Sequence, residues 1–530
     1  MTMEDKKRVK AIGIDLGTTT TVVSYTGKKT GKLKQLKYNG EKIIPSVIYF
    51  KSASDWIIGE SAAAMMALHP EAGVENFKSH LVDSDFRYDV IAENQEHFFL
   101  RPREAAKRFL QTVVQGMQDK LIKEFGGLDG TIDRAVITVP AKFAMRAKTA
   151  TKRAARDCGL AVKITKEPTA AATDYLHRYS EFDKNGTAIL VYDFGGGTFD
   201  VSVVQRHQDS FKEIATGGDN TLGGNLLTEH ITRYLIGRIE EQYAVSFPEE
   251  EDADELEEEA YIAYQKNMAA VRRAANQMKE ALSDESEVER DIWLTFDEQK
   301  KIFGAYLSRD SFEDMIRPDI NRTVKIVQNT LEQAAEKGID HIDTVVLVGG
   351  SSKVPLVRTA VQKRLPHLDI DPPSDADYLI SRGATLLAER VENLDHIALI
   401  TNTQIGTKAK EGMVFNKFQM LIPENTPLPA SGSRSFILDH DGQEKIQIPY
   451  YEYDVDNHPG MTRTDQDGME QVDVLTVELP PGLKKQDTEI EVLFTMQRDG
   501  SLEIEAVIKD TTGTVIRDRN LKLKHETDLE

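Results

Sequence analysis

The stretch Val191-Tyr192-Asp193-Phe194-Gly195-Gly196-Gly197-Thr198-Phe199-Asp200 decides how the rest of the chain is interpreted. An apolar strand over residues 188–191 leads to the carboxylate of Asp193 and then into a turn of three glycines. Glycine adopts positive φ freely and lets backbone N–H groups approach a bulky anion. The stretch therefore predicts a phosphate-binding hairpin, although a glycine turn that only reverses a buried strand has the same pattern.

A second copy near the amino terminus favours the phosphate-binding interpretation. Ala11-Ile12-Gly13-Ile14-Asp15-Leu16-Gly17-Thr18-Thr19-Thr20 repeats the order of apolar strand, aspartate, glycine, small residues and threonine, and another strand follows over residues 22–25. Two copies of one motif predict two similar half-domains that face each other across a cleft. Such a cleft could bind a polyphosphate from both sides.

Composition limits the classes of partner and the compartment. A chain of 530 residues with 40% hydrophobic content is long enough for two or three globular domains, and its net charge of −21 argues against nucleic acid or an anionic membrane as partner. The single cysteine, Cys158, excludes an internal disulfide and is interpreted as a packing residue rather than a nucleophile. Residues 1–10 lack the apolar core of a signal peptide, and no run reaches the length of a membrane span, so we expect a cytoplasmic protein.

Hydrophobic periodicity divides the chain into an α/β part and a β part. Helices are predicted over residues 60–68, 102–125, 143–158, 226–242 and 269–282 and from Pro355, and strands over 32–38, 42–50, 134–140 and 344–348. From Gln404 onward the pattern alternates with a period of two, and residues 498–501 predict a tight hairpin turn. The predicted division is an α/β domain over 9–392, a short apolar linker over 393–401, and a compact β domain over 402–524.

Three further motifs place polar groups near the predicted cleft. Glu167-Pro168-Thr169-Ala170-Ala171-Ala172 starts a helix, which makes Glu167 either a helix-end charge or, beside two phosphate hairpins, a candidate to hold a metal-bound water. Residues 217–225 form a glycine-rich loop before a helix, and Gly349-Gly350-Ser351-Ser352-Lys353 forms another, suited to a sugar or base edge. Lys279 and Ser283, four residues apart, are predicted to share one helix face.

Five motifs, taken in order, resemble the seventy-kilodalton heat-shock (DnaK-type) chaperone family. They are Ile14-Asp15-Leu16-Gly17-Thr18-Thr19, Val139-Pro140-Ala141, Glu167-Pro168-Thr169-Ala170-Ala171, the 193–200 hairpin and Gly349-Gly350-Ser351. Actin-like proteins and sugar kinases share the duplicated fold but not this full set followed by a β domain. The resemblance implies an actin-like, duplicated ribonuclease H-like ATPase domain followed by a small all-β sandwich that binds peptides.

The resemblance also implies roles for individual residues. Phosphates, magnesium and the attacking water would be handled by Asp15, Gly17, Thr18, Thr19, Thr20, Lys78, Glu167, Asp193, Gly195, Gly196, Gly197, Thr198 and Asp200. Within this set, catalysis falls to Asp15, Lys78, Glu167, Asp193, Thr198 and Asp200, and magnesium is held through water by Asp15, Glu167 and Asp193, with potassium as a further candidate ion. The nucleoside of ATP or ADP would be held by Gly223, Gly224, Asn276, Lys279, Ser283, Gly349, Gly350, Ser351, Lys353 and Asp377. Without the resemblance, Lys78 would be interpreted as a surface lysine.

In the β domain the resemblance places Phe436, Ile446 and Ile448 at a pocket for extended, unfolded polypeptide, although the same residues suit ordinary sandwich core. It also implies a J-domain co-chaperone and a nucleotide-exchange factor as partners. After residue 523 too few residues remain for the family's helical lid, as a natural end or a trimmed one, and we expect faster peptide release than in a lidded relative.

Several positions depart from the family pattern. Lys353 stands where an arginine usually stacks on adenine, Asn225 and Asn276 replace acids, Leu399 replaces a linker aspartate, and Lys166 replaces the asparagine before Glu167, near the expected J-domain site.

Three functions therefore compete. The first is an ATP-dependent chaperone, and the second is a slow or inactive nucleotide sensor whose β domain binds one dedicated protein. The third, a small-molecule kinase, is weakened by the β domain.

Overall fold

The computed structural model describes most of the chain. The described residues are 11–27, 31–66, 68–83, 85–125, 132, 134–141, 143, 145–179, 182–207, 210–248, 258–296, 299–368, 370, 375–389, 404–411, 414–423, 426, 428–453, 469–497, 502–510, 515–517 and 523–525. The predicted linker over 393–401, with Leu399, and the hairpin turn over 498–501 lie outside them. No helix in the described ranges is both long enough and apolar enough to cross a membrane.

The first lobe is organised around a sheet in the order β11-β10-β1-β2-β3, with β4 paired to β2. Its strands are β1 (Ala11–Leu16), β2 (Thr20–Thr26), β3 (Leu33–Gln35), β4 (Ile44–Pro45), β10 (Arg134–Val139) and β11 (Ala161–Lys166). β1 runs antiparallel to β2 and parallel to β10. The inner strands are apolar runs buried on both faces, as expected for a parallel sheet covered by helices such as α2 (Pro102–Phe125) and α3 (Met145–Arg156).

The second lobe repeats this arrangement. Its sheet has the order β14-β13-β12-β17, formed by β12 (Ala188–Phe194), β13 (Phe199–His207), β14 (Ser210–Asp219) and β17 (Thr344–Val348). β12 runs antiparallel to β13 and parallel to β17, as β1 does to β2 and β10. The repeated motif in the sequence is therefore matched by a repeated strand order in space.

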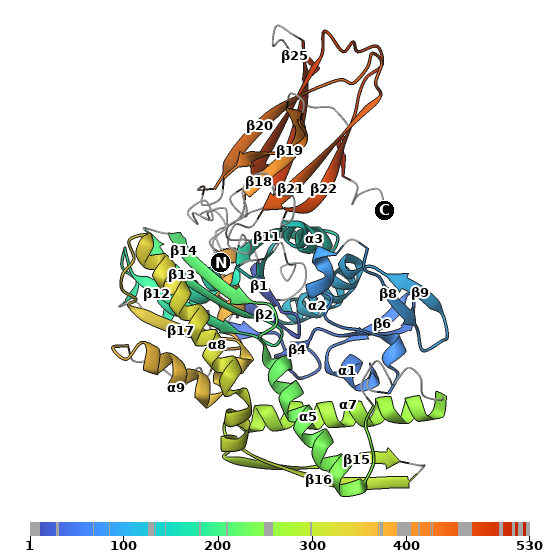
Figure 1. The fold of residues 1–530 in the computed structure, drawn as a ribbon, viewed down its shortest axis with the longest axis vertical. Coiled ribbons are helices and arrows are strands. Elements are labelled where there is room, and N and C mark those ends of the chain that lie inside the picture. Colours follow the sequence, from blue (N-terminus) through green and yellow to red (C-terminus); the bar gives the residue numbers. More distant parts are fainter. Residues whose placement is uncertain are drawn as a thin grey trace.

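Smaller elements surround the two sheets. Those of the first lobe are β5 (Ile48–Ser52), β6 (Asp55–Ile58), α1 (Glu60–Met66), η2 (Pro70–Ala72), β7 (Gly73–Val74), η3 (Ser79–Val82), β8 (Tyr88–Ile91) and β9 (His97–Leu100). The second lobe adds α5 (Gly224–Tyr243), α7 (Glu258–Ala281), β15 (Glu287–Phe296), β16 (Gln299–Ser308), α8 (Arg309–Glu336), η6 (Gly350–Lys353) and α9 (Pro355–Arg364). Figure 1 places α5, α7, β15 and β16 at the end of the molecule opposite the β domain.

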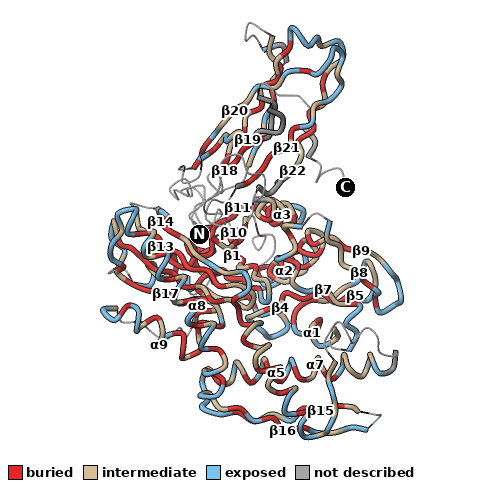
Figure 2. The backbone as a smooth tube through the Cα atoms, in the orientation of Figure 1, coloured by how far each residue is buried: buried red, intermediate tan, exposed pale blue. Residues whose placement is uncertain are grey.

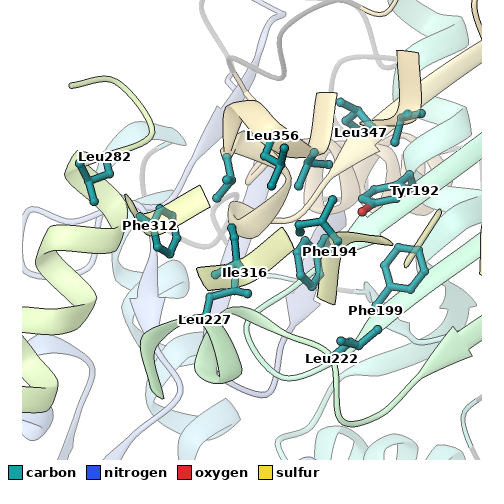
Figure 3. Packing of buried hydrophobic residues seen from close by; sticks show 14 of the residues in the cluster. Tyr192, Phe194, Phe199, Leu222, Leu227, Leu282, Phe312, Ile316, Leu347 and Leu356 are labelled. Atoms are coloured by element: carbon teal, nitrogen blue, oxygen red, sulfur yellow. The ribbon is translucent and has the colours of Figure 1, made fainter. Parts of the chain in front are cut away.

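Aromatic and aliphatic side chains fill the interior of the second lobe. Tyr192, Phe194 and Phe199 from the hairpin strands are fully buried and stand in one cluster with Phe312 and Ile316 of α8 (Figure 3). Buried residues concentrate in the central strands of both sheets, whereas the outlying hairpin β15–β16 alternates between buried and exposed positions (Figure 2). The hairpin formed by β12 and β13 is therefore anchored in a closely packed core.

Two helices join the lobes. α4 (Glu167–Arg178) packs on the sheet of the second lobe, and α10 (Leu379–Glu389) packs on β1 of the first, while the two helices cross each other. The crossing is close at Gly383, because a Cβ there would lie 1.8 Å from the carbonyl oxygen of Ala170. Contact at this distance requires glycine.

We therefore expect Gly383→Ala to lower stability strongly. The backbone of α4 would have to move, and overpacking of this kind costs about 3 kcal/mol. The matched control is Gly237→Ala in α5, where a Cβ would meet nothing within 4 Å and where alanine favours the helix by up to about 1 kcal/mol. Thermal unfolding of the full chain should show a lower midpoint for Gly383→Ala only; equal midpoints for the two variants would contradict the close crossing.

The β domain is a sandwich of two sheets. One has the order β19-β18-β21-β22-β26 and the other β20-β23-β24-β25. The strands are β18 (Gln404–Glu411), β19 (Val414–Ile422), β20 (Ala430–Ile437), β21 (Lys445–Tyr453), β22 (Met469–Glu478), β23 (Glu489–Met496), β24 (Leu502–Lys509), β25 (Val515–Arg517) and β26 (Leu523–His525). Strict alternation along β23 places every second side chain in the core between the sheets.

The β domain packs against the first lobe. Ala11, Val136 and Leu387 from β1, β10 and α10 belong to the same buried cluster as Ile405 and Ile422 of the sandwich. α3 also contacts β22. Figure 1 shows the β domain standing beside α3 and β11.

The strand predicted over 42–50 is interrupted, because β4 pairs with β2 whereas β5 belongs to a separate sheet with β6 and β7. Two expectations about α7 were also wrong. The helix predicted over 269–282 begins at Glu258, because the turns before residue 269 also pack on β15, where the buried Asn267 side chain exchanges hydrogen bonds with the backbone of Thr295. Ser283 does not share the helical face of Lys279, because the helix ends at Ala281 and Ser283 lies in the following turn. The carbonyl oxygen of Ser283 accepts a hydrogen bond from Arg309 Nη2 at 3.4 Å.

Candidate functional site

The two glycine–threonine hairpins meet face to face. A Cβ on Gly196 would lie 2.3 Å from Thr19 Oγ1, and a Cβ on Gly197 would lie 3.6 Å from the Cβ of Thr18. The hairpins belong to different lobes, so their contact closes one shared site. The turns are held by matching hydrogen bonds, from Gly17 N to Thr20 O at 3.0 Å and from Gly195 N to Thr198 O at 3.1 Å.

Four carboxylates gather at this contact. Burial, and next the charge of Glu167, raise the pKa of Asp15 to about 7, while Lys78 and the hydroxyl of Thr138 act to lower it. Burial raises the pKa of Asp193 well above its usual range, with added repulsion from Glu167, Asp200 and Asp15. The two motif aspartates therefore lie within reach of each other's charge, as the facing half-domains predict.

Lys78 and Glu167 form a buried ion pair. Lys78 Nζ donates to Glu167 Oε1 at 2.9 Å, with the residues 3% and 8% exposed. Lys78 precedes η3 in the first lobe, and Glu167 is the first residue of α4, where an acid also favours the helix dipole. The surface-lysine interpretation of Lys78 was therefore wrong, because η3 turns its side chain into the interior beside the ring of Phe143.

Two threonines orient the carboxylates. Thr198 Oγ1 donates to Asp200 Oδ2 at 3.3 Å, and Thr138 Oγ1 donates to Asp15 Oδ1 at 2.9 Å. Thr138 was missed by the sequence reasoning. The signal was available in principle, because Thr138 is a polar residue near the end of a buried strand, and it pairs directly with Asp15 in the β1–β10 ladder.

The loop before α5 rests on the second hairpin. Gly224 N donates to Gly195 O at 2.9 Å, and Asn225 N donates to Gly196 O at 2.7 Å. A Cβ on Gly223 would lie only 2.5 Å from the carbonyl carbon of Gly197. The start of α5 thereby lies against the hairpin, and helix starts favour anions.

The predicted nucleoside residues fall into two groups beside this loop. Lys279 Nζ donates to Gly224 O at 3.0 Å and to Thr228 Oγ1 and Asn276 Oδ1, each at 2.8 Å. Burial lowers the pKa of Lys279 to about 8. Thr228 is a second residue that the sequence reasoning missed.

The other group follows β17. Ser351 Oγ donates to Gly195 O at 2.8 Å, which connects this turn to the hairpin. Gly349 has a φ of +82°, a conformation that favours glycine. Lys353 forms an ion pair with Asp377, so the residue that replaces the expected arginine is held by a carboxylate.

The donor set suits a hard divalent cation held through water. Within the described ranges, no three acidic, histidine or cysteine side chains are grouped closely enough to bind a metal directly. Buried carboxylates with raised pKa values at Asp15 and Asp193 nevertheless favour a compensating positive charge. Magnesium keeps several of its waters, so oxygen ligands at a distance fit it.

The proposed peptide residues lie on both sheets of the sandwich. Phe436 is on β20, and Ile446 and Ile448 are on β21 of the facing sheet. Ile448 is buried in the core cluster, and the other two are half-buried against it. The positions of these three side chains are compatible both with ordinary core packing and with a pocket that opens into the core.

The pKa of Asp15 predicts a pH effect on stability without metal. In the folded state the Asp15 carboxyl keeps its proton up to about pH 7, whereas in the unfolded state it loses the proton near pH 3.8. The folded state therefore binds more protons between these pH values, and the contribution of Asp15 lowers the free energy of unfolding progressively as the pH rises through them. Asp15→Asn should therefore raise the unfolding midpoint relative to the parent more at pH 7.5 than at pH 5, measured in EDTA. Asp284→Asn on an exposed turn is the control, and an Asp15→Asn difference that shrinks toward pH 7.5 would refute this account.

Comparisons with known proteins identify the family of the chain. The family model described as Hsp70 protein matches residues 11–526. The chaperone protein DnaK of Thermotoga petrophila is 28% identical over 519 residues, which cover 95% of this chain and 79% of that protein. The DnaK of Mycoplasma mobile is 30% identical over 511 residues, which cover 95% of this chain and 77% of that protein. The chain therefore belongs to the Hsp70 family.

Proposed function

We propose that this chain is an ATP-dependent molecular chaperone that hydrolyses ATP to gate the binding and release of extended apolar peptide segments. The observation that carries the proposal is the contact between two glycine–threonine hairpins beside the buried Lys78–Glu167 pair, in a member of the Hsp70 family with a β-sandwich domain. The DnaK relatives are named as chaperones. The proposed division is an actin-like, duplicated ribonuclease H-like ATPase domain over 9–392, a linker over 393–401 and a peptide-binding domain over 402–524.

Each site residue then has a physical task. Lys78 presents an ammonium group that stabilises negative charge developing on the transferred phosphoryl group. Glu167 is paired with Lys78, so it keeps the ammonium group of Lys78 in place, and it orients the attacking water. Asp15 and Asp193 would hold magnesium through its waters, and the ion would supply positive charge that neutralises the phosphates. Thr198, bonded to Asp200, lies on the hairpin that would approach the terminal phosphate.

Glycine backbone and the nucleoside residues would hold ATP in place. Backbone N–H groups of the two hairpins would bind phosphate oxygens, and the helix dipole at the start of α5 would favour their negative charge. Lys279, Asn276, Ser351 and Lys353 would contact the nucleoside. We also propose cytoplasmic localisation, a J-domain co-chaperone and a nucleotide-exchange factor as partners, as the resemblance implies.

Phosphate release tests the proposal directly. With Mg-ATP, an extended apolar peptide should raise the rate of phosphate release by about fivefold or more, the scale of ordinary coupling between two sites. Ile446→Ser in the half-buried pocket should abolish the stimulation. Ile437→Ser, at a position of β20 in the facing sheet that is 68% exposed, is the matched control and should keep the stimulation.

The nucleotide-sensor alternative gives a different result. It is favoured by the Lys353–Asp377 ion pair, because a lysine held by a carboxylate cannot stack on adenine as arginine does. A sensor would bind ADP and show no peptide stimulation in any variant. That outcome would overturn the chaperone proposal while leaving the nucleotide site intact.

A further inference from the structure

An arginine of α8 holds the loop between β14 and α5. Arg322 Nη2 donates to Asp219 Oδ2 and, at 3.0 Å, to Thr221 Oγ1. Within the loop, Asp219 Oδ1 accepts from the backbone N of Thr221 at 2.9 Å and from its hydroxyl at 2.7 Å. Burial acts to raise the pKa of Asp219, but the hydrogen bonds from Thr221 and the charge of Arg322 hold it below its usual value, so the carboxylate stays charged near neutral pH. One carboxylate therefore both stabilises the loop and connects it to α8.

The same loop contacts the phosphate-binding turn over residues 195–198 at both ends. At the start of the loop, Asp219 pairs with Phe199 in the β13–β14 ladder, directly after the turn. At its end, the backbone N of Gly224 donates to Gly195 O at 2.9 Å. Both contacts are made by the backbone, so rotation of a side chain cannot release them. A displacement of the loop should therefore move the turn with it.

α8 is itself anchored to the strand that leads into this turn. Thr323, next to Arg322, is fully buried, and its hydroxyl is hydrogen-bonded to the hydroxyl of Tyr192 on β12 at 2.7 Å. β14 also lies close against the helix, because a Cβ on Gly217 would be 2.4 Å from Thr330 Oγ1. One helix therefore holds the strand that enters the turn and, through Arg322, the loop that contacts it.

The exposure of Arg322 separates this local role from the stability of the whole chain. The Arg322 side chain is 48% exposed, and that of Asp219 is 18% exposed. Ion pairs with a largely exposed partner contribute little to the global free energy of unfolding. Loss of the arginine should therefore loosen the loop while the lobe stays folded.

We propose that Arg322 is a positioning residue for ATP hydrolysis, which acts through Asp219 and Thr221 to hold the 195–198 turn in place. The inference rests on the proposed function, because Thr198 of this turn is taken to approach the terminal phosphate of ATP. ADP lacks that phosphate. Loss of the contact should therefore lower the rate of hydrolysis while the affinity for ADP is kept.

Phosphate release from the full chain under saturating Mg-ATP tests this role. Arg322→Met should lower kcat by about fivefold, less than the roughly 100-fold loss for a displacement of about 1 Å, because Gly224 still bonds to the turn. The affinity for ADP and the unfolding midpoint should match the parent. Arg317→Met is the matched control and should keep the parent kcat, because this arginine of α8 pairs with Asp314 of the same helix, at 2.8 Å. Equal kcat in the two variants, or a loss of kcat that only accompanies a lower midpoint, would overturn the role of Arg322.

A double-variant cycle tests whether Arg322 acts through the carboxylate. Asp219→Asn keeps an oxygen that can accept from Thr221 but removes the charge that holds Arg322, so it should lower kcat on the same scale. Arg322→Met/Asp219→Asn should then be no slower than the slower single variant, because residues that act as a unit are not additive. Effects that multiply would show that Arg322 does not act through Asp219.

Amide hydrogen exchange of the nucleotide-free chain separates failure of this role from failure of the proposed function. A peptide over residues 219–225 should exchange faster in Arg322→Met and Asp219→Asn than in Arg317→Met, because the loop opens at a lower free-energy cost once its connection to α8 is lost. A peptide over β15 is the reference and should exchange equally in all three. Unchanged exchange over 219–225 would overturn the role of Arg322, whereas faster exchange there in a chain that binds no ADP would overturn only the nucleotide function.

Discussion

Lys78→Met should lower the rate of ATP hydrolysis by about 10²–10³-fold, the scale of losing one preorganised group that stabilises transition-state charge. Methionine keeps the length and much of the packing of the lysine but carries no charge. The ammonium of Lys78 is buried and bonded to Glu167 at 2.9 Å, so surrounding water cannot replace it. Phosphate release under saturating Mg-ATP measures the effect.

The control must separate chemistry from folding. Lys78→Met leaves Glu167 buried without its partner, which costs about 3–5 kcal/mol in comparable pairs. The double variant Lys78→Met/Glu167→Gln removes both charges and should fold with a midpoint closer to the parent while remaining inactive. Recovery of hydrolysis in the double variant would show that Lys78 acts only by compensating Glu167.

Gly223→Ala should displace the second hairpin and lower kcat/KM for ATP by about 100-fold, since misplacement by about 1 Å costs that much. The φ of Gly223 is −173°, which any residue adopts, so only the close approach matters. Its Cβ would lie 2.5 Å from the carbonyl carbon of Gly197 and 2.6 Å from the oxygen of Gly196, and both are backbone atoms that cannot rotate away.

A second glycine provides the comparison. A Cβ on Gly304 of β16 would meet nothing within 4 Å, so Gly304→Ala should keep the parent kcat/KM. Calorimetric titration with ADP shows whether the Gly223 variant loses affinity as well as rate. Normal affinity and rate in Gly223→Ala would mean that the loop before α5 does not support the hairpin.

Local pattern was sufficient for several elements. The helix predicted over 102–125 is observed as α2 with the same ends, because one apolar face continues through its whole length. Both hairpins were predicted from the order of strand, aspartate, glycine and threonine, and their strands pair as that order implies. The family followed from motifs spread over almost the whole chain.

Other features depended on residues far apart in the sequence. Lys78 and Glu167 are 89 residues apart, and no local pattern predicts that η3 turns the lysine inward toward α4. The pairing of Lys353 with Asp377 and of Lys166 with Glu213 likewise unites distant segments. Ser283 was misplaced because helical spacing was extended past the turn in which α7 ends.

The sequence alone therefore determined the strand order within each motif, the separation into α/β and β parts, and the chemical character of the two hairpins, since periodicity, glycine and carboxylate spacing are local properties. Only the tertiary structure decided which charges meet. Ion pairs such as Lys166–Glu213 form where two sheets come together, and burial there, rather than sequence position, makes each charge require a partner.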